Sequence, residues 1–139
     1  MIYEDDVVDC VVGFIEEHGW TIESLAHANE HGDDIAATRG GRRLLVEAKG
    51  EGSSKAGTRR FGLGFTRGQV GSHLGVAVVR ALRWASKGDV LPALAFPDNQ
   101  FHRSAVEPIT PALERVGVGV FWVKEDRTVE LQAPWDLGT

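Results

Sequence analysis

The order in which apolar segments follow one another predicts an α/β protein with a mixed β-sheet flanked by helices. Three segments with strand character follow a first helix, and helix and strand then alternate. The expected order is helix, three strands, helix, strand, helix and strand, with one further short strand as an option. The 139 residues are 42% hydrophobic and 25% charged, so we expect a single domain that spans the whole chain and has its own core.

The first half of the chain supplies the first helix and three strands. Residues 5–18 place valine, phenylalanine and isoleucine at helical spacing, and Gly19 is a stop signal. Residues 20–29 are expected to form the first strand. The next two strands form a hairpin, in which the runs Ile-Ala-Ala and Leu-Leu-Val are joined by a turn at Gly40 and Gly41.

The second half is expected to alternate helices and strands, at residues 66–87, 90–96, 101–116, 118–123 and 128–131. Gly71 and Gly75 weaken the long helix, and their presence predicts close packing of that helix against the sheet. The runs 90–96 and 118–123 are almost continuously apolar, which is typical of buried strands. Pro108 and Pro111 are expected to split or delay the second helix.

The composition argues against several classes of protein. No apolar stretch approaches the roughly 20 residues that span a bilayer, so no membrane partner is expected. The acidic first residues do not resemble a secretory signal. The one cysteine, Cys10, cannot form an internal disulfide. These features predict a cytoplasmic protein.

Positive charge is concentrated in one part of an otherwise acidic chain. The formal net charge is −5, yet residues 39–67 hold eight basic residues against two acidic ones. A local basic patch beside carboxylates suits a phosphodiester substrate, whereas the simpler alternative is a solvated basic loop. The candidate nucleic-acid contacts are Arg43, Lys55, Arg59, Arg60 and Arg67. His73 is a further candidate, with a structural role in the fold as its alternative.

The predicted hairpin carries the most informative residues of the chain. Asp34 lies just before its first strand, and Glu47 and Lys49 lie at the end of its second strand. Because side chains alternate along a strand, Glu47 and Lys49 share one face and Ala48 points to the other. A tight turn can bring Asp34 beside Glu47. Two carboxylates and an ammonium would suit a hard divalent cation, whereas the alternative is a pair of solvated charges on a strand edge.

This pattern resembles the PD-(D/E)XK superfamily of metal-dependent nucleases, which share the restriction-endonuclease-like fold. Asp34 matches the first Asp of the motif, and Glu47-Ala48-Lys49 matches its (D/E)-x-K. Asp33 stands where the family usually has proline, and the likeness covers residues 3–123. The resemblance implies an enzyme that hydrolyses DNA phosphodiester bonds with Mg²⁺, or with Mn²⁺ in its place.

The resemblance also assigns roles to individual residues. Asp34, Glu47 and the backbone carbonyl of Ala48 would hold the metal, and Lys49 would orient the attacking water. Asp33 is left as a turn residue or an outer acid. Two further residues would assist: Gln69 at the start of the long helix and Glu4 in the first helix. Their alternatives are an ordinary glutamine and an acid that favours a helix N-terminus.

Two functions of different classes follow from these observations. The first is a DNA endonuclease, with specificity set by DNA structure or by a partner. A homodimer would place one catalytic site on each strand of the DNA. The segment around Trp122 and Trp135 is its candidate interface. The second is a non-catalytic module of the same fold that binds nucleic acid or a protein, which the overall acidity favours.

Overall fold

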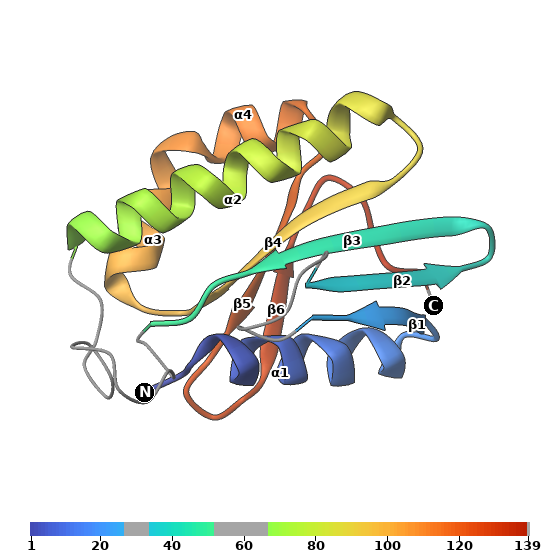
Figure 1. Cartoon of the computed structure of the whole chain (residues 1–139), viewed down its shortest axis with the longest axis horizontal. Coiled ribbons are helices and arrows are strands. Elements are labelled where there is room, and N and C mark those ends of the chain that lie inside the picture. The colour runs from blue at the N-terminus through green and yellow to red at the C-terminus, as the bar shows by residue number, and fades with distance from the viewer. Residues whose placement is uncertain (27–33, 52–66, 139) are drawn as a thin grey trace.

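The computed structural model describes residues 1–26, 34–51 and 67–138. A six-stranded sheet forms the middle layer, and helices cover both of its faces. Figure 1 shows α1 against one face and α2, α3 and α4 against the other. The prediction of a mixed sheet flanked by helices is confirmed.

The helices and strands follow one another along the chain as α1 (Glu4–Glu17), β1 (Thr21–Leu25), β2 (Ile35–Arg39), β3 (Arg42–Ala48), α2 (Arg67–Lys87), β4 (Leu91–Pro97), α3 (Gln100–Val106), the 3₁₀ helix η1 (Glu107–Ile109), α4 (Thr110–Arg115), β5 (Gly119–Val123) and β6 (Val129–Gln132). In the described part of the chain, no helix has both the length and the apolar composition to cross a membrane.

The strands lie in the sheet in chain order, from β1 to β6. The first three pair antiparallel, β3, β4 and β5 pair parallel, and β6 returns antiparallel to β5. Strands β4 and β5 are buried along nearly their whole length, as their continuous apolar runs require. In the hairpin, Ile35 pairs with Val46, and this register places Asp34 opposite Glu47.

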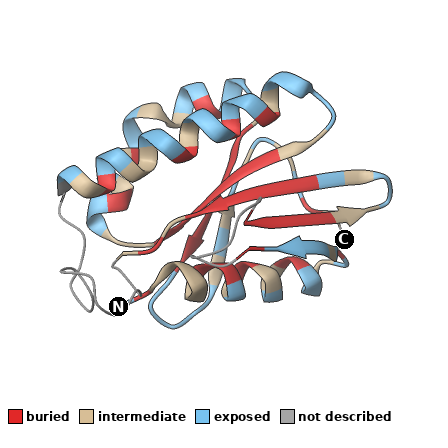
Figure 2. Ribbon diagram, in the orientation of Figure 1, coloured by how far each residue is buried: buried red, intermediate tan, exposed pale blue. Residues whose placement is uncertain are grey.

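Each face of the sheet has its own hydrophobic core (Figure 2). Val7, Val11 and Ile15 of α1 pack on one face, together with Ala48 of β3. Ala77 and other apolar residues of α2 pack on the opposite face with Leu45, Leu94 and Trp122. Because Ala48 faces α1, its neighbours Glu47 and Lys49 face α2.

Two predicted elements differ in their limits. The helix expected at residues 101–116 consists of α3, η1 and α4, because Pro108 and Pro111 each open a new helical segment. The first strand ends at Leu25 rather than at residue 29, and its pairing with β2 is irregular between Ile22 and Ser24. Residues 27–33, which include Asp33, lie outside the described residues.

The close packing predicted at Gly71 and Gly75 is wrong. Both glycines are exposed on α2, and a Cβ atom added at either position would meet no heavy atom of the described residues within 4 Å. Val70 and Ala77, which lie at helical spacing, are buried instead. A glycine can lie on the buried or on the exposed face of an amphipathic helix, and Gly71 and Gly75 lie on the exposed face of α2.

The tryptophans expected at a dimer interface are used within the chain. Trp122 is 1% exposed, so its own side chain is not available to a partner. The indole of Trp135 donates a hydrogen bond to the carbonyl of Gly117 at 2.8 Å. A Cβ on Gly119 would lie 2.7 Å from the Trp135 ring, so this glycine allows the ring to pack against β5.

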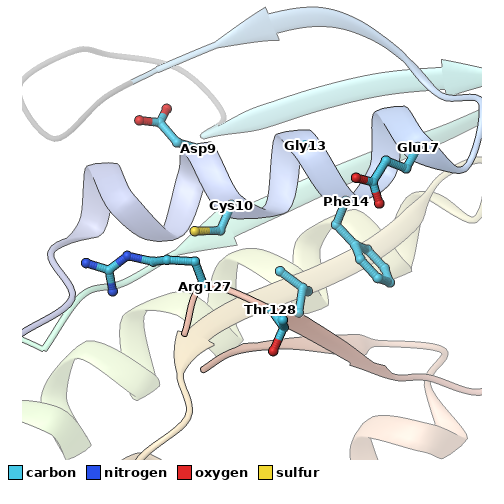
Figure 3. A pocket seen from close by; sticks show the side chains of 8 residues that line it. Asp9, Cys10, Gly13, Phe14, Glu17, Arg127 and Thr128 are labelled. Atoms are coloured by element: carbon cyan, nitrogen blue, oxygen red, sulfur yellow. The ribbon is translucent and has the colours of Figure 1, made fainter. Parts of the chain in front are cut away.

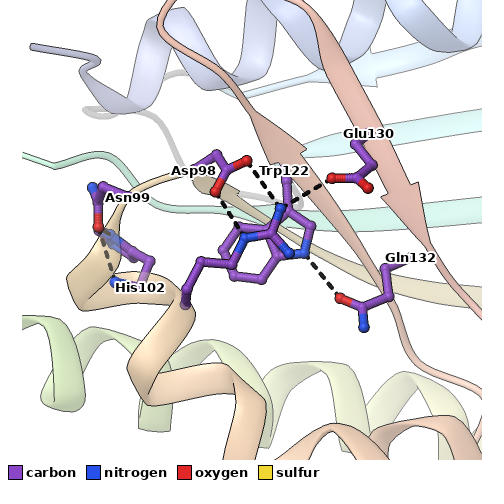
Figure 4. Close-up of polar contacts among 7 residues, drawn as sticks. Asp98, Asn99, His102, Trp122, Glu130 and Gln132 are labelled. Atoms are coloured by element: carbon purple, nitrogen blue, oxygen red, sulfur yellow. Dashed lines mark hydrogen bonds and ion pairs between the residues drawn. The ribbon is translucent and has the colours of Figure 1, made fainter.

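A polar cluster around Arg103 fixes α3 to the end of the sheet (Figure 4). The guanidinium lies 4.1 Å from the centre of the Trp122 ring. It donates two hydrogen bonds to Asp98, at 2.7 and 2.9 Å, and one to Glu130 at 3.0 Å. The Arg103 hydrogen bonds hold the pKa of Asp98 below its usual value. Trp122 in turn donates from Nε1 to Gln132 at 3.0 Å.

Candidate active site

The β2–β3 hairpin brings the two acids of the motif together. Asp34 immediately precedes β2, and Glu47 lies one residue before the end of β3. The side chains of Asp34 and Glu47 share a hydrogen bond. The amide of Ala48 also donates to Oδ2 of Asp34 at 2.7 Å. The hairpin register predicted from the sequence therefore places both carboxyl groups at one point of the sheet.

Both acids are buried, and Glu47 is flanked by two cations. Asp34 is 7% exposed and Glu47 is 4% exposed. The Lys49 ammonium lies 3.8 Å from Oε1 of Glu47, and Nη1 of Arg80 lies 2.8 Å from Oε2. The alternative of two solvated charges on a strand edge is therefore wrong for Glu47. A buried carboxylate with partners on both oxygens belongs to an organised polar site.

The environment of Asp34 favours its protonated form. Burial raises its pKa to about 8, and the hydrogen bond with Glu47 and the negative charges of Glu47 and Glu4 act in the same direction. The Ala48 amide opposes them. Two neighbouring buried carboxyl groups cannot both ionise at low cost, so the proton belongs to the pair. A bound cation would relieve the same repulsion.

The donor set fits a hard divalent cation that retains water ligands. Among the residues that the structure describes, no group of three or more His, Cys, Asp or Glu side chains could hold a metal. A cation at this site would therefore rely on two carboxyl groups. The site offers the carboxyl groups of Asp34 and Glu47 beside the backbone of Ala48. Mg²⁺ is commonly bound through one or two carboxylates and several waters, so these oxygens are sufficient.

The backbone after the motif passes against the start of α1. The Lys49 amide donates to the carbonyl of Ala95 at 3.0 Å, which ties the end of β3 to β4. A Cβ added to Gly50 would lie 2.6 Å from the carbonyl carbon of Tyr3 and would also meet the amide nitrogen of Glu4. The absence of a side chain at Gly50 thus lets the first turn of α1 approach. The charge of Glu4 reaches Asp34 from there, where it contributes to the raised pKa.

The helix α2 carries two residues predicted for the site, Gln69 as an assisting residue and His73 as a nucleic-acid contact. Burial lowers the pKa of His73, and the charge of Lys49 lowers it further, so His73 lies within electrostatic reach of Lys49. Gln69 lies one turn earlier in α2 and is partly buried. Successive turns of a helix repeat every 3.6 residues, so Gln69 and His73 share one flank of α2. The structure places this flank beside the end of β3.

Of the predicted nucleic-acid contacts, the side chains of His73 and Arg43 are described, and His73 is the one within reach of the Lys49 charge. Arg43 lies near the turn of the hairpin, at the other end of β3, and pairs with Glu23 at 3.3 Å. Arg67 opens α2, and its side chain is not described. The remaining candidates, Lys55, Arg59 and Arg60, lie outside the described residues.

Sequence reasoning missed two parts of this region. The first is Arg80, which pairs with Glu47. Its helical spacing from Gln69 could have placed it on the same flank of α2, but not against Glu47. The second is a hydrogen-bonded chain in which Asn99 donates to Glu51 at 3.0 Å and contacts Nδ1 of His102 at 2.9 Å. Figure 4 shows Asn99 and His102 beside each other at the start of α3. Burial lowers the pKa of His102 to about 4, so its ring is neutral.

The opposite face of the sheet has a groove of its own. About 490 Å³ in volume, it lies between α1 and the start of β6, with Cys10, Phe14 and Arg127 among its lining residues (Figure 3). Burial raises the pKa of the Cys10 thiol, which disfavours the reactive thiolate. This groove lies on the α1 side of the sheet, whereas Glu47 faces α2, so it forms no part of the carboxylate site.

Comparison with known proteins shows similarity at the level of the fold. No family model and no curated protein matches the sequence. A solved structure of an fdxN element excision controlling factor protein from Anabaena variabilis is 17% identical, with a TM-score of 0.57 over 93% of this chain and 98% of that chain. An XisH family protein from Nostoc punctiforme is 15% identical, with a TM-score of 0.56 over 92% and 98%. At this identity, the likeness shows a common fold alone.

Proposed function

We propose that this protein is a metal-dependent endonuclease that hydrolyses DNA phosphodiester bonds, on a restriction-endonuclease-like fold. The observation that carries the proposal is the pair of buried, hydrogen-bonded carboxyl groups of Asp34 and Glu47, with Lys49 beside Glu47 at 3.8 Å. Burial, and after it the neighbouring Glu47 and Glu4, raise the pKa of Asp34 to about 8. Acids with a pKa perturbed by burial and a neighbouring charge are typical of functional sites.

Each residue of the site has a separate role in the proposed hydrolysis. Asp34 and Glu47, with the carbonyl of Ala48, would hold Mg²⁺ or Mn²⁺, which supplies charge neutralisation and an activated water when bound. The Lys49 ammonium lies where it can orient that water and stabilise negative charge that develops on the phosphoryl oxygens. Gln69 and His73 lie on the adjacent flank of α2, where they can contact the substrate backbone.

The structural neighbours are compatible with a role in DNA processing. One of them carries the name of an excision controlling factor for the fdxN element. That name describes the Anabaena variabilis protein, and its fold is shared over nearly the whole of both chains. It supports a DNA substrate as the first one to test.

A second candidate function is a non-catalytic module that binds nucleic acid or a protein. The ion pair between Arg80 and Glu47, at 2.8 Å, favours it, because a cation of the protein itself already balances the carboxylate. Such a module would bind its ligand without need of a divalent metal.

The test is cleavage of labelled linear, nicked, branched and single-stranded DNA in Mg²⁺, Mn²⁺ or EDTA. Wild type is compared with Asp34→Ala, with Lys49→Ala, and with Glu125→Ala as an exposed control. We expect cleavage that requires metal and is lost in the first two variants but kept in Glu125→Ala. Salt-sensitive binding without cleavage in either metal would favour the binding module.

A further inference from the structure

Arg80 contacts the carboxylate site but has no role in the hydrolysis proposed above. Its Nη1 atom donates to Oε2 of Glu47 at 2.8 Å, across the space between α2 and β3. Glu47 has only 5% of its side chain exposed, whereas Arg80 has 44%. The carboxylate is therefore fixed in the interior, and the guanidinium reaches it from the rim. Of the two partners, Arg80 is the one that can move without disturbing the core.

The place of Arg80 on α2 connects it to the rest of the site. Gln69, His73 and Arg80 recur near whole turns of a 3.6-residue helix and so form one flank of α2. This flank faces the end of β3, because Arg80 contacts Glu47 and the charge of Lys49 acts on His73. A substrate backbone that lies over Lys49 would run along the same flank.

A divalent cation and Arg80 compete for the same carboxylate. The Glu47 oxygens face Lys49 and Arg80 on their two sides, and Asp34 adds a hydrogen bond. A cation bound between Asp34 and Glu47 would repel both basic side chains, and Arg80 is the more exposed of the two. A guanidinium released from Glu47 presents a planar set of donors that matches a phosphate group better than an ammonium does.

We infer that Arg80 is a phosphate-binding residue of this site, held by Glu47 until that carboxylate binds a divalent cation. This role rests on the proposed nuclease function, and it links substrate binding to metal binding. Arg80 balances the buried carboxylate in the metal-free protein, which keeps the site folded. When Glu47 takes a divalent cation, Arg80 turns to the phosphodiester and adds its charge beside Lys49.

The test uses two readouts that should move in opposite directions. Mn²⁺ affinity is measured without DNA by calorimetry, and DNA cleavage is then measured at saturating Mn²⁺. We expect Arg80→Gln to bind Mn²⁺ about tenfold more tightly, which is the scale of coupling between close charges, and to cleave DNA at least about tenfold more slowly. Arg80→Lys, which keeps the charge, should bind Mn²⁺ as wild type does.

The matched control is Arg83→Gln, which removes the same charge from an exposed position of the same helix. It should leave both readouts unchanged, and thermal unfolding confirms that each variant is folded. Mn²⁺ affinity that does not rise in Arg80→Gln, or that rises equally in Arg83→Gln, overturns the inference. Tighter Mn²⁺ binding with unchanged cleavage overturns the phosphate role.

Different results would overturn the proposed function and this inference. If wild type binds Mn²⁺ but cuts no DNA, the nuclease proposal falls, and the competition between Arg80 and the metal is still decided by the Mn²⁺ affinities. If neither wild type nor Arg80→Gln binds Mn²⁺, both proposals are overturned. A rise in affinity confined to Arg80→Gln supports the competition between Arg80 and the metal for Glu47, whatever substrate the site acts on.

Discussion

Replacement of Asp34 by asparagine should stabilise the metal-free protein at neutral pH. Asparagine keeps the shape of the side chain, can accept the hydrogen bond from the Ala48 amide and can donate one to Glu47. It removes the need to keep a proton on a buried acid. Removing a site residue commonly has this effect, because active sites are built at the expense of stability.

The magnitude follows from the pKa of Asp34. Burial and the neighbouring Glu47 raise this pKa from its ordinary value of 3.8 to about 8 in the folded chain. At pH 7 the unfolded chain releases the proton and the folded chain keeps it, so unfolding is favoured by up to about 4 kcal/mol, at about 1.4 kcal/mol for each pH unit above the lower pKa. Partial relaxation of the coupled pair reduces the expected gain of Asp34→Asn to about 2–4 kcal/mol.

The sign of the pH dependence distinguishes this cause from others. A raised acid pKa in the folded state means that wild type loses stability relative to Asp34→Asn as pH rises from about 4 to about 8. The assay is urea unfolding of both proteins in EDTA at several pH values. The two curves should nearly coincide at pH 4 and separate steadily above it. An Asp34→Asn protein that is less stable at pH 7, or whose advantage does not grow with pH, would refute the reasoning.

Substitutions elsewhere test other parts of the account. Lys49→Met should slow DNA cleavage in Mg²⁺ about 100-fold, as expected for loss of a charge-stabilising group, and an unchanged rate would exclude that role. Gly50→Ala should lower stability by about 2 kcal/mol in thermal unfolding, since its Cβ would meet the backbone of α1, whereas Gly13→Ala, with open space, should stabilise by about 1 kcal/mol. Arg103→Ala should cost about 2 kcal/mol at pH 7 in urea unfolding. Its cost should shrink as pH falls through the lowered pKa of Asp98, and an equal cost at pH 7 and pH 3 would contradict that pairing.

The carboxylate pair could be predicted because it depends on local structure. Strand alternation fixes Glu47 and Lys49 on one face, and the tight turn fixes the register that sets Asp34 opposite Glu47. Continuous apolar runs identified β4 and β5 as buried strands for a similar reason. Each of these inferences needs only a few neighbouring residues and the period of the structure they form.

The contacts that complete the site could not be predicted in the same way. The pairing of Arg80 with Glu47 depends on how α2 crosses the sheet, which no local pattern specifies. The link from Glu51 to Asn99 likewise joins residues 48 apart in the sequence. Gly71 and Gly75 were misassigned because a glycine within a helix is equally consistent with close packing and with open solvent.

The central claim is that Asp34, Glu47 and Lys49 form a metal-dependent site for phosphodiester hydrolysis. Its most direct test is the initial rate at which the purified protein nicks supercoiled plasmid DNA, measured against Mg²⁺ concentration for wild type and Glu47→Gln. The account predicts a rate for wild type that rises and saturates with Mg²⁺ and is abolished by EDTA, and a loss of at least about 100-fold in Glu47→Gln. Nicking that persists in EDTA, or that Glu47→Gln retains at the wild-type rate, would contradict it.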